Sequence, residues 1–345
     1  MNHELVTKQQ SLKTFLEEEL TELKTKNLYR ETVNHLKYYP GIINFSSNDY
    51  LGLGSRIINA EGLQYGSTGS RLTTGTHEIH EQLESFIANW KQTEAAIIFS
   101  SGYLANLGTL SALLNPRDVV FSDEYNHSCI FDGIRLSGAK KFIYKHNDME
   151  HLQELLSKHR DSFAKAIIIT DTVFSMDGDR ARLKELSQLS KSFECSSYVD
   201  EAHATGVLGP SGAGLVEELV SQGEINHSDI DIHMGTFSKA VGLEGAYIAG
   251  SKELINFLKN KARTFVFSTA SSPIILNKVL DNLKIIQENH GLRDKLRHNI
   301  QFFRAKLNEH GFTAWTNEDT AIFAIELGGV KHTLKVSEQL RDQGL

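Results

Sequence analysis

The chain has 345 residues, of which 40% are hydrophobic and 23% charged, and its formal net charge is −7. This composition is ordinary for a soluble globular protein, and the length suits one large domain with smaller flanking pieces. The acidic balance argues against a general nucleic-acid-binding protein, although helix N-termini can still bind a small anion. The spacing of Cys129 and Cys195 predicts free thiols and no metal site.

The first twenty residues are polar, and no apolar run is long enough to span a bilayer. We therefore expect a cytoplasmic protein without a signal peptide or a membrane segment. A helix is expected from about residue 12 to residue 26, where apolar residues recur at helical spacing. A short strand is expected over residues 42–45.

From about residue 75, helical and strand-like segments alternate. This alternation predicts an α/β fold with a mostly parallel sheet and helices on both faces. Strands are expected over residues 95–99, 118–121, 166–170, 197–200, 232–235, 246–249 and 321–326. Helices are expected over residues 103–114, 183–193, 273–309 (as one long helical stretch) and 334–341. We expect an N-terminal helical segment over 1–43, a large domain over 44–275 and a C-terminal domain over 276–345.

Polar clusters follow five of these expected strands directly, at residues 100–102, 123–127, 171–177, 200–203 and 236–239. In sheets of this kind, ligands bind beyond the carboxyl ends of the strands. The convergence of these clusters predicts one site at that edge of the sheet.

The groups in these clusters suit a pyridine aldehyde cofactor. Lys239 follows a buried strand, and its amine is able to form a Schiff base and then to act as a general base. Asp200 ends another buried strand, where its carboxylate requires a cation, either a protonated pyridine nitrogen or an arginine or lysine. His203 would donate to the phenol oxygen of the cofactor. Together they predict pyridoxal phosphate as cofactor.

A phosphate site is expected where a helix opens after the strand over 95–99. Backbone N–H groups of Gly102 and Tyr103 would bind the phosphate, with hydroxyl donors from Thr236 and Ser238. The same segment also fits an ordinary helix N-cap. No zinc-protease helix, Walker phosphate loop or dinucleotide-binding glycine motif is present.

Over nearly its whole length, from about Asn44 to Leu345, the chain resembles the α-oxoamine synthases, which are fold-type I pyridoxal-phosphate enzymes. The resemblance rests on the motifs at residues 44–53, 66–72, 101–106, 177–178 and 200–214. It is closest to members that condense L-alanine with pimeloyl-CoA or a pimeloyl carrier protein, releasing carbon dioxide and making 8-amino-7-oxononanoate for biotin. The alternative substrates are glycine and acetyl-CoA, as in the related 2-amino-3-ketobutyrate ligase (glycine C-acetyltransferase).

The resemblance also implies a role for each candidate residue. Lys239 would hold the cofactor, and Asp200 would pair with its ring nitrogen. Of the other positions, His127 would cover one face of the ring, His203 and Ser175 would contact its oxygen, and Gly102, Tyr103, Thr236 and Ser238 would bind the phosphate. Asn48 and Arg30 would contact the substrate. Thr269 would reach the phosphate of a neighbouring subunit, which implies a homodimer.

The chain departs from the family pattern in two places. The connection over residues 54–64 is shorter than usual. Relatives also continue beyond the position of Leu345 into a segment that supplies an arginine for the substrate carboxylate. We therefore expect an incomplete C-terminal domain, and a chain that binds the cofactor without turnover is a third reading.

Overall fold

The computed structural model describes residues 11–32, 34, 41–56, 62, 64–316 and 318–345. The chain divides into two compact units. One combines Met1–Ser47 with Glu326–Leu345, and the other is Asn48–Ile325. The domain boundaries expected from the sequence stay a prediction.

Among its described residues, the smaller unit holds two helices, α1 (Leu12–Thr25) and α13 (Val330–Asp342). Both were expected from the sequence. Helix α1 begins where the Ser11 hydroxyl accepts a hydrogen bond from the Thr14 N–H at 3.1 Å. The strand expected over residues 42–45 is wrong, because the segment forms no ladder with a neighbouring strand. Its Ile43 N–H instead donates to the Gly344 carbonyl at 2.8 Å.

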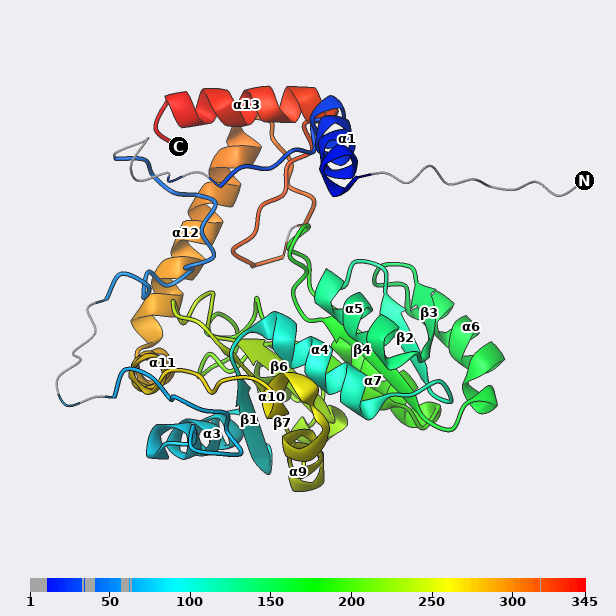
Figure 1. Cartoon of the computed structure of the whole chain (residues 1–345). Helices are drawn as coiled ribbons and strands as arrows, with labels where there is room; N and C mark the ends of the chain where they lie inside the picture. Colours follow the sequence, from blue (N-terminus) through cyan, green and yellow to red (C-terminus); the bar gives the residue numbers. More distant parts are fainter. Residues whose placement is uncertain (1–10, 33, 35–40, 57–61, 63, 317) are drawn as a thin grey trace, which may run out of the picture. The chain divides into compact units, whose positions relative to one another are not determined.

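The larger unit is built on a seven-stranded sheet (Figure 1). Its strands are β1 (Ala95–Phe99), β2 (Val119–Asp123), β3 (Lys140–Tyr144), β4 (Ala166–Asp171), β5 (Ser196–Asp200), β6 (Ile232–Thr236) and β7 (Ala246–Gly250). They lie in the order β1-β7-β6-β5-β4-β2-β3, and β7 alone runs against the others. The expected mostly parallel α/β fold is confirmed.

Helices cover both faces of this sheet (Figure 1). One face packs against α4 (Gly102–Leu113), α5 (Ser128–Ser137), α9 (Lys252–Lys261) and α10 (Arg263–Val266). The other packs against α3 (Glu78–Lys91), α6 (Met149–His159), α7 (Leu183–Ser192) and α11 (Pro273–Glu288). Alternate strand residues serve the two faces: Ile167 and Ile169 lie in one cluster and Ile168 in another. Two further helices are α8 (Leu215–Ser221) and α12 (His290–Glu309).

Three expectations need correction in this unit. The helical stretch over 273–309 is two helices, α11 and α12, separated at Asn289. Residues 321–326 form no strand, although the Ala324 carbonyl accepts a hydrogen bond from the Trp315 N–H at 2.9 Å. The sequence reading also gave no strand where β3 forms the exposed edge of the sheet. Within the described residues, no helix combines the length and the apolar character that a bilayer crossing requires.

Candidate active site

The polar segments that follow the strands meet at one edge of the sheet, because every strand except β7 points the same way. Strands β4 and β5 are paired in register, so their last residues, Asp171 and Asp200, are direct neighbours. Both carboxyl groups are buried. Strand β6 lies on the other side of β5 and leads into the segment that carries Lys239.

Lys239 lies close to these two carboxyl groups. Burial lowers the pKa of its amine, and the charges of Asp200 and Asp171 oppose part of that effect. Among the described residues, its amine has no hydrogen-bond or ion-pair partner. Burial, together with the charge of Asp200, raises the pKa of Asp171 well above its usual range. The site therefore combines an amine that has no partner among the described residues with two neighbouring carboxyl groups, one of which has a raised pKa.

The carboxyl group of Asp200 is fixed by a buried hydrogen-bond network. The Asn106 amide on α4 donates to Asp200 Oδ2 at 2.7 Å, and the Ala202 N–H donates to Asp200 Oδ1 at 2.9 Å. The Tyr198 hydroxyl in turn donates to Asn106 Oδ1 at 2.6 Å. Because that hydroxyl fixes the orientation of the amide, the Asn106 N–H₂ must face Asp200.

His203 is a neutral imidazole joined to the loop that precedes the sheet. Burial, together with the positive charge of Lys239, lowers its pKa to about 2. Its Nδ1 lies 2.8 Å from the Tyr50 hydroxyl, which also lies 3.2 Å from Asn48 Oδ1. The structure therefore links two predicted site residues, His203 and Asn48, through a tyrosine that the sequence reading assigned no role.

His127 is exposed and caps helix α5. Its Nδ1 lies 2.8 Å from Cys129 Sγ and accepts a hydrogen bond from the Cys129 N–H at 3.3 Å. Burial, together with the negative charge of Asp200, raises the pKa of the Cys129 thiol to about 12. This thiol is therefore protonated, and it also accepts a hydrogen bond from the Asn106 amide at 3.1 Å.

The expected phosphate donors gather at the start of α4. A Cβ placed on Gly102 would lie 3.8 Å from Thr236 Oγ1 and only 2.9 Å from Met234 Cε. The Thr236 hydroxyl shares a 2.9 Å hydrogen bond with Ser238. The side chain of Tyr103 points elsewhere and bonds Asp132 on α5, so only its backbone N–H remains for this role.

Three further candidates take no part in the contacts described so far. Ser175 is half-buried, in the hairpin that follows β4. Thr269 is exposed and pairs with Ser70 in an antiparallel bridge. Arg30 belongs to the smaller unit. Their roles stay predictions.

Pyridoxal phosphate needs an amine for its aldehyde, an acid for its ring nitrogen and donors for its phosphate, and the described residues offer each. Lys239 supplies the amine and Asp200 the acid. The N-terminus of α4 beside Thr236 supplies the phosphate site. Glycine at position 102 keeps the approach to this helix end open, because a Cβ there would lie too close to Met234 Cε.

Several residues of the site carried no assigned role in the sequence reading. Asn106 and Tyr50 lie inside the motifs of the family resemblance, which was the available signal. Asp171 was noted only as part of a polar cluster. Cys129 and Tyr198 gave no signal, since their types are common in cores.

Comparison with known proteins agrees with this geometry. The family model described as aminotransferase class I and II matches residues 40–345. Two curated relatives carry the name "Putative 8-amino-7-oxononanoate synthase". The one from Rippkaea orientalis is 42% identical, with 96% of this chain and 89% of the relative covered. The one from Gloeothece citriformis is 46% identical, with 88% and 80% covered.

Solved structures give the same grouping. A serine palmitoyltransferase from S. paucimobilis, determined with bound PLP and myriocin, has a TM-score of 0.85 at 26% identity and covers 98% of this chain and 91% of its own. The 8-amino-7-oxononanoate synthase of Francisella tularensis has a TM-score of 0.75 at 30% identity, with 88% and 86% covered. The chain therefore belongs to the aminotransferase class I and II family, among its pyridoxal-phosphate-dependent α-oxoamine synthases.

Proposed function

We propose that this protein condenses L-alanine with a pimeloyl thioester, carried by CoA or by a carrier protein, and releases carbon dioxide and the free thiol to give 8-amino-7-oxononanoate for biotin synthesis. The observation that carries the proposal is the half-buried amine of Lys239 beside Asp200, which has no partner among the described residues, in a chain 42–46% identical to relatives with that name. The proposed location is the cytoplasm.

When bound, pyridoxal phosphate supplies an aldehyde for amines and a ring that accepts the electron pair left at the substrate Cα. Lys239 would hold the aldehyde and, once released, would take the Cα proton, since burial lowers the pKa of its amine. Asp200, oriented by Asn106, would accept a hydrogen bond from the ring nitrogen. His203, being neutral, would donate one ring proton to the phenol oxygen.

The remaining site residues would bind and orient the reactants. The backbone of Gly102 and Tyr103, with the hydroxyls of Thr236 and Ser238, would bind the phosphate. The proposal keeps His127 over one ring face and Ser175 at the phenol oxygen. It also keeps Asn48 and Arg30 as contacts of the substrate carboxylate.

The test is release of thiol from pimeloyl-CoA in the presence of L-alanine, run beside glycine with acetyl-CoA. Turnover with the first pair supports the proposal, and preference for the second reassigns the substrates. Lys239→Ala should abolish turnover and the visible absorption of bound cofactor, while Lys261→Ala, at an exposed position of α9, should change neither. Normal turnover by Lys239→Ala would refute the assignment of the lysine.

We also propose a homodimer in which Thr269 of one subunit reaches the phosphate of the other. Thr269 is exposed in the single chain, and its segment is fixed where the Ala270 N–H donates to the Gly69 carbonyl at 2.9 Å. Light scattering should give twice the chain mass of 38.6 kDa. A monomer that turns over normally would contradict the shared site.

A further inference from the structure

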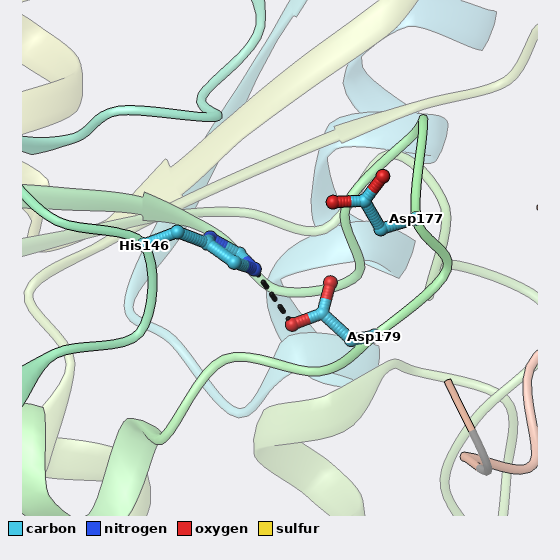
Figure 2. A group of neighbouring side chains, drawn as sticks. All are labelled: His146, Asp177 and Asp179. Carbon is cyan, nitrogen blue, oxygen red and sulfur yellow. Dashed lines mark hydrogen bonds and ion pairs between the residues drawn. The ribbon is translucent and has the colours of Figure 1, made fainter. Parts of the chain in front are cut away.

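A histidine outside the site described above lies between two carboxylates. His146 follows β3, and its Nδ1 lies 2.9 Å from Asp123 Oδ1 while its Nε2 lies 2.8 Å from Asp179 Oδ2. Figure 2 shows the ring of His146 directed at Asp179, with Asp177 on the same loop. The ligand atoms of these three residues lie within 4.8 Å of one another. A cation bound here would have to displace the proton on Nε2, which Asp179 already accepts.

The surroundings of the ring favour the doubly protonated, charged form. Ionised carboxylates only accept hydrogen bonds, so each ring nitrogen must donate a proton to keep both contacts. Burial alone would lower the pKa of His146. The hydrogen bonds and charges of Asp123 and Asp179 outweigh it and raise the pKa to about 10. Tyr125 stacks on the ring at 4.4 Å, and Phe174 meets it edge-on at 4.4 Å, which fixes its orientation.

Asp123, the first carboxylate, is the last residue of β2 and anchors the loop that carries His127. Its Oδ1 also accepts the Tyr125 N–H at 2.9 Å, and its Oδ2 accepts the Asn147 N–H at 2.9 Å. In the same loop, the Asn126 side chain bonds β4. The position of this carboxylate thus fixes where the loop to His127 begins.

The second carboxylate, Asp179, closes the hairpin that carries Ser175. The Phe174 N–H donates to the Asp179 carbonyl at 3.0 Å, and the Gly178 N–H donates to the Phe174 carbonyl at 2.9 Å. Asp179 Oδ2 also accepts the Asn147 amide at 2.6 Å. His146 and its neighbour Asn147 therefore both link the base of this hairpin to the loop of His127, and His146 is the member of the pair that can carry a charge.

We propose that His146 is a positioning residue, a charged imidazolium that fixes the Ser175 hairpin relative to the His127 loop so that both residues face the cofactor. The proposal rests on the proposed function for the roles of His127 and Ser175, but not for the charge on His146. The titratable groups that face the ring are Asp123 and Tyr125 from the β2 loop and Asp177 and Asp179 from the hairpin, while Glu124 accepts a hydrogen bond from the backbone N–H of His146. Three of the four groups at the ring are carboxyl groups, which favours the charged ring.

The charge is tested first, in cofactor-free protein. A nitrogen–proton correlation spectrum of the histidine side chains at pH 8 should show both ring protons of His146, assigned by their loss in His146→Gln. An ordinary histidine is neutral at this pH and carries a single ring proton. One proton on the His146 ring, or loss of the Nε2 proton on adding Zn²⁺, would overturn the proposal. Neither result depends on turnover.

Positioning is tested by titrating the cofactor-free protein with pyridoxal phosphate. His146→Gln removes the charge and is expected to raise the dissociation constant of the cofactor roughly tenfold. This is the change in affinity that the loss of one charge-assisted hydrogen bond produces. His159→Gln is the matched control, since His159 stacks on Phe142 at 4.0 Å and forms no ion pair with a carboxylate of the described residues. An equal loss in both variants would overturn the proposal.

A double-mutant cycle separates positioning from general stability. If His146 acts through Ser175, then His146→Gln should cost little further affinity in a Ser175→Ala background, whereas independent effects would add. Full additivity would overturn the positioning role. Failure of the unmodified protein to bind pyridoxal phosphate would refute the proposed function instead, and the spectrum at pH 8 would still decide the charge of His146.

Discussion

Asn106→Asp is the substitution that tests the centre of the site most directly. The side chain is fully buried, and its amide donates to Asp200 Oδ2 at 2.7 Å. The aspartate has nearly the same shape, so the packing is kept while a second carboxyl group is placed against the first. Two carboxylates with charge centres about 4 Å apart repel by about 4 kcal/mol at the effective dielectric of protein sites.

The size of this effect should depend on pH. Repulsion of about 4 kcal/mol raises the pKa of the introduced group by about 3 units, from about 4 in the unfolded chain to about 7 in the folded one. Its protonated form still donates to Asp200, so the variant should be nearly as stable as the parent below pH 4. As pH rises from about 4 to about 7, the unfolded chain releases this proton while the folded state still retains it. The loss in free energy of unfolding should therefore grow to about 4 kcal/mol.

Urea unfolding of the cofactor-free protein, followed by intrinsic fluorescence at a fixed protein concentration, measures this loss. Adding Asp200→Asn to Asn106→Asp exchanges the two groups and restores one donor opposite one acceptor, so most of the stability at pH 8 should return. A stability loss that is equal at pH 4 and pH 8, or an exchange that recovers nothing, would refute the inferred contact between Asn106 and Asp200.

Two further substitutions probe the surrounding fold. Gly178 has a φ of +76°, and a Cβ there would lie 2.6 Å from the Ile322 carbonyl. Gly178→Ala should therefore lower the free energy of unfolding by more than the roughly 1–2 kcal/mol that the backbone conformation alone costs. Gly223→Ala, with a φ of +73° and open space around it, is the control in urea unfolding, and equal losses in the two variants would contradict the contact with Ile322. Lys91→Met leaves Glu201 buried without its cation and should lower the free energy of unfolding by about 3–5 kcal/mol, measured by urea unfolding at pH 7. Adding Glu201→Leu removes the unpaired carboxylate and should recover most of this loss.

Sequence reasoning predicted the elements whose pattern is local. The apolar run of β4 has the character of a strand buried on both faces, and it forms such a strand. Residues 321–326 have a similar apolar character but form no strand, because strand formation depends on a ladder of hydrogen bonds to a neighbour that the local pattern does not reveal. Strand β3 was missed for the converse reason: Lys140, Lys141 and Ile143 are exposed at the sheet edge, so the segment lacks a buried pattern.

For the site, the chain order of the strand ends was enough to indicate Lys239 and Asp200. The contacts that orient them were not predictable in the same way. Asn106 and Asp200 are 94 positions apart, and their contact depends on how α4 packs on the sheet. Likewise, the pairing of His146 with Asp123 and Asp179 arises only when three strand ends come together. Residue type and spacing thus predict the reacting groups, whereas the residues that hold them in place require the three-dimensional structure.

Tyr50→Phe tests one such supporting contact, the 2.8 Å hydrogen bond between the Tyr50 hydroxyl and His203 Nδ1. His203 is neutral, so it carries one ring proton, and the Tyr50 hydroxyl either donates to Nδ1, which keeps that proton on Nε2, or accepts the proton from Nδ1 and donates to Asn48 Oδ1. Losing one neutral hydrogen bond corresponds to about 0.5–1.5 kcal/mol, or a roughly two- to tenfold weaker affinity for pyridoxal phosphate. Tyr247→Phe is the control, because its buried hydroxyl lies 3.2 Å from Thr205 Oγ1 and does not contact His203. Unchanged affinity in Tyr50→Phe, or an equal loss in Tyr247→Phe, would show that this hydroxyl does not control the proton position on His203.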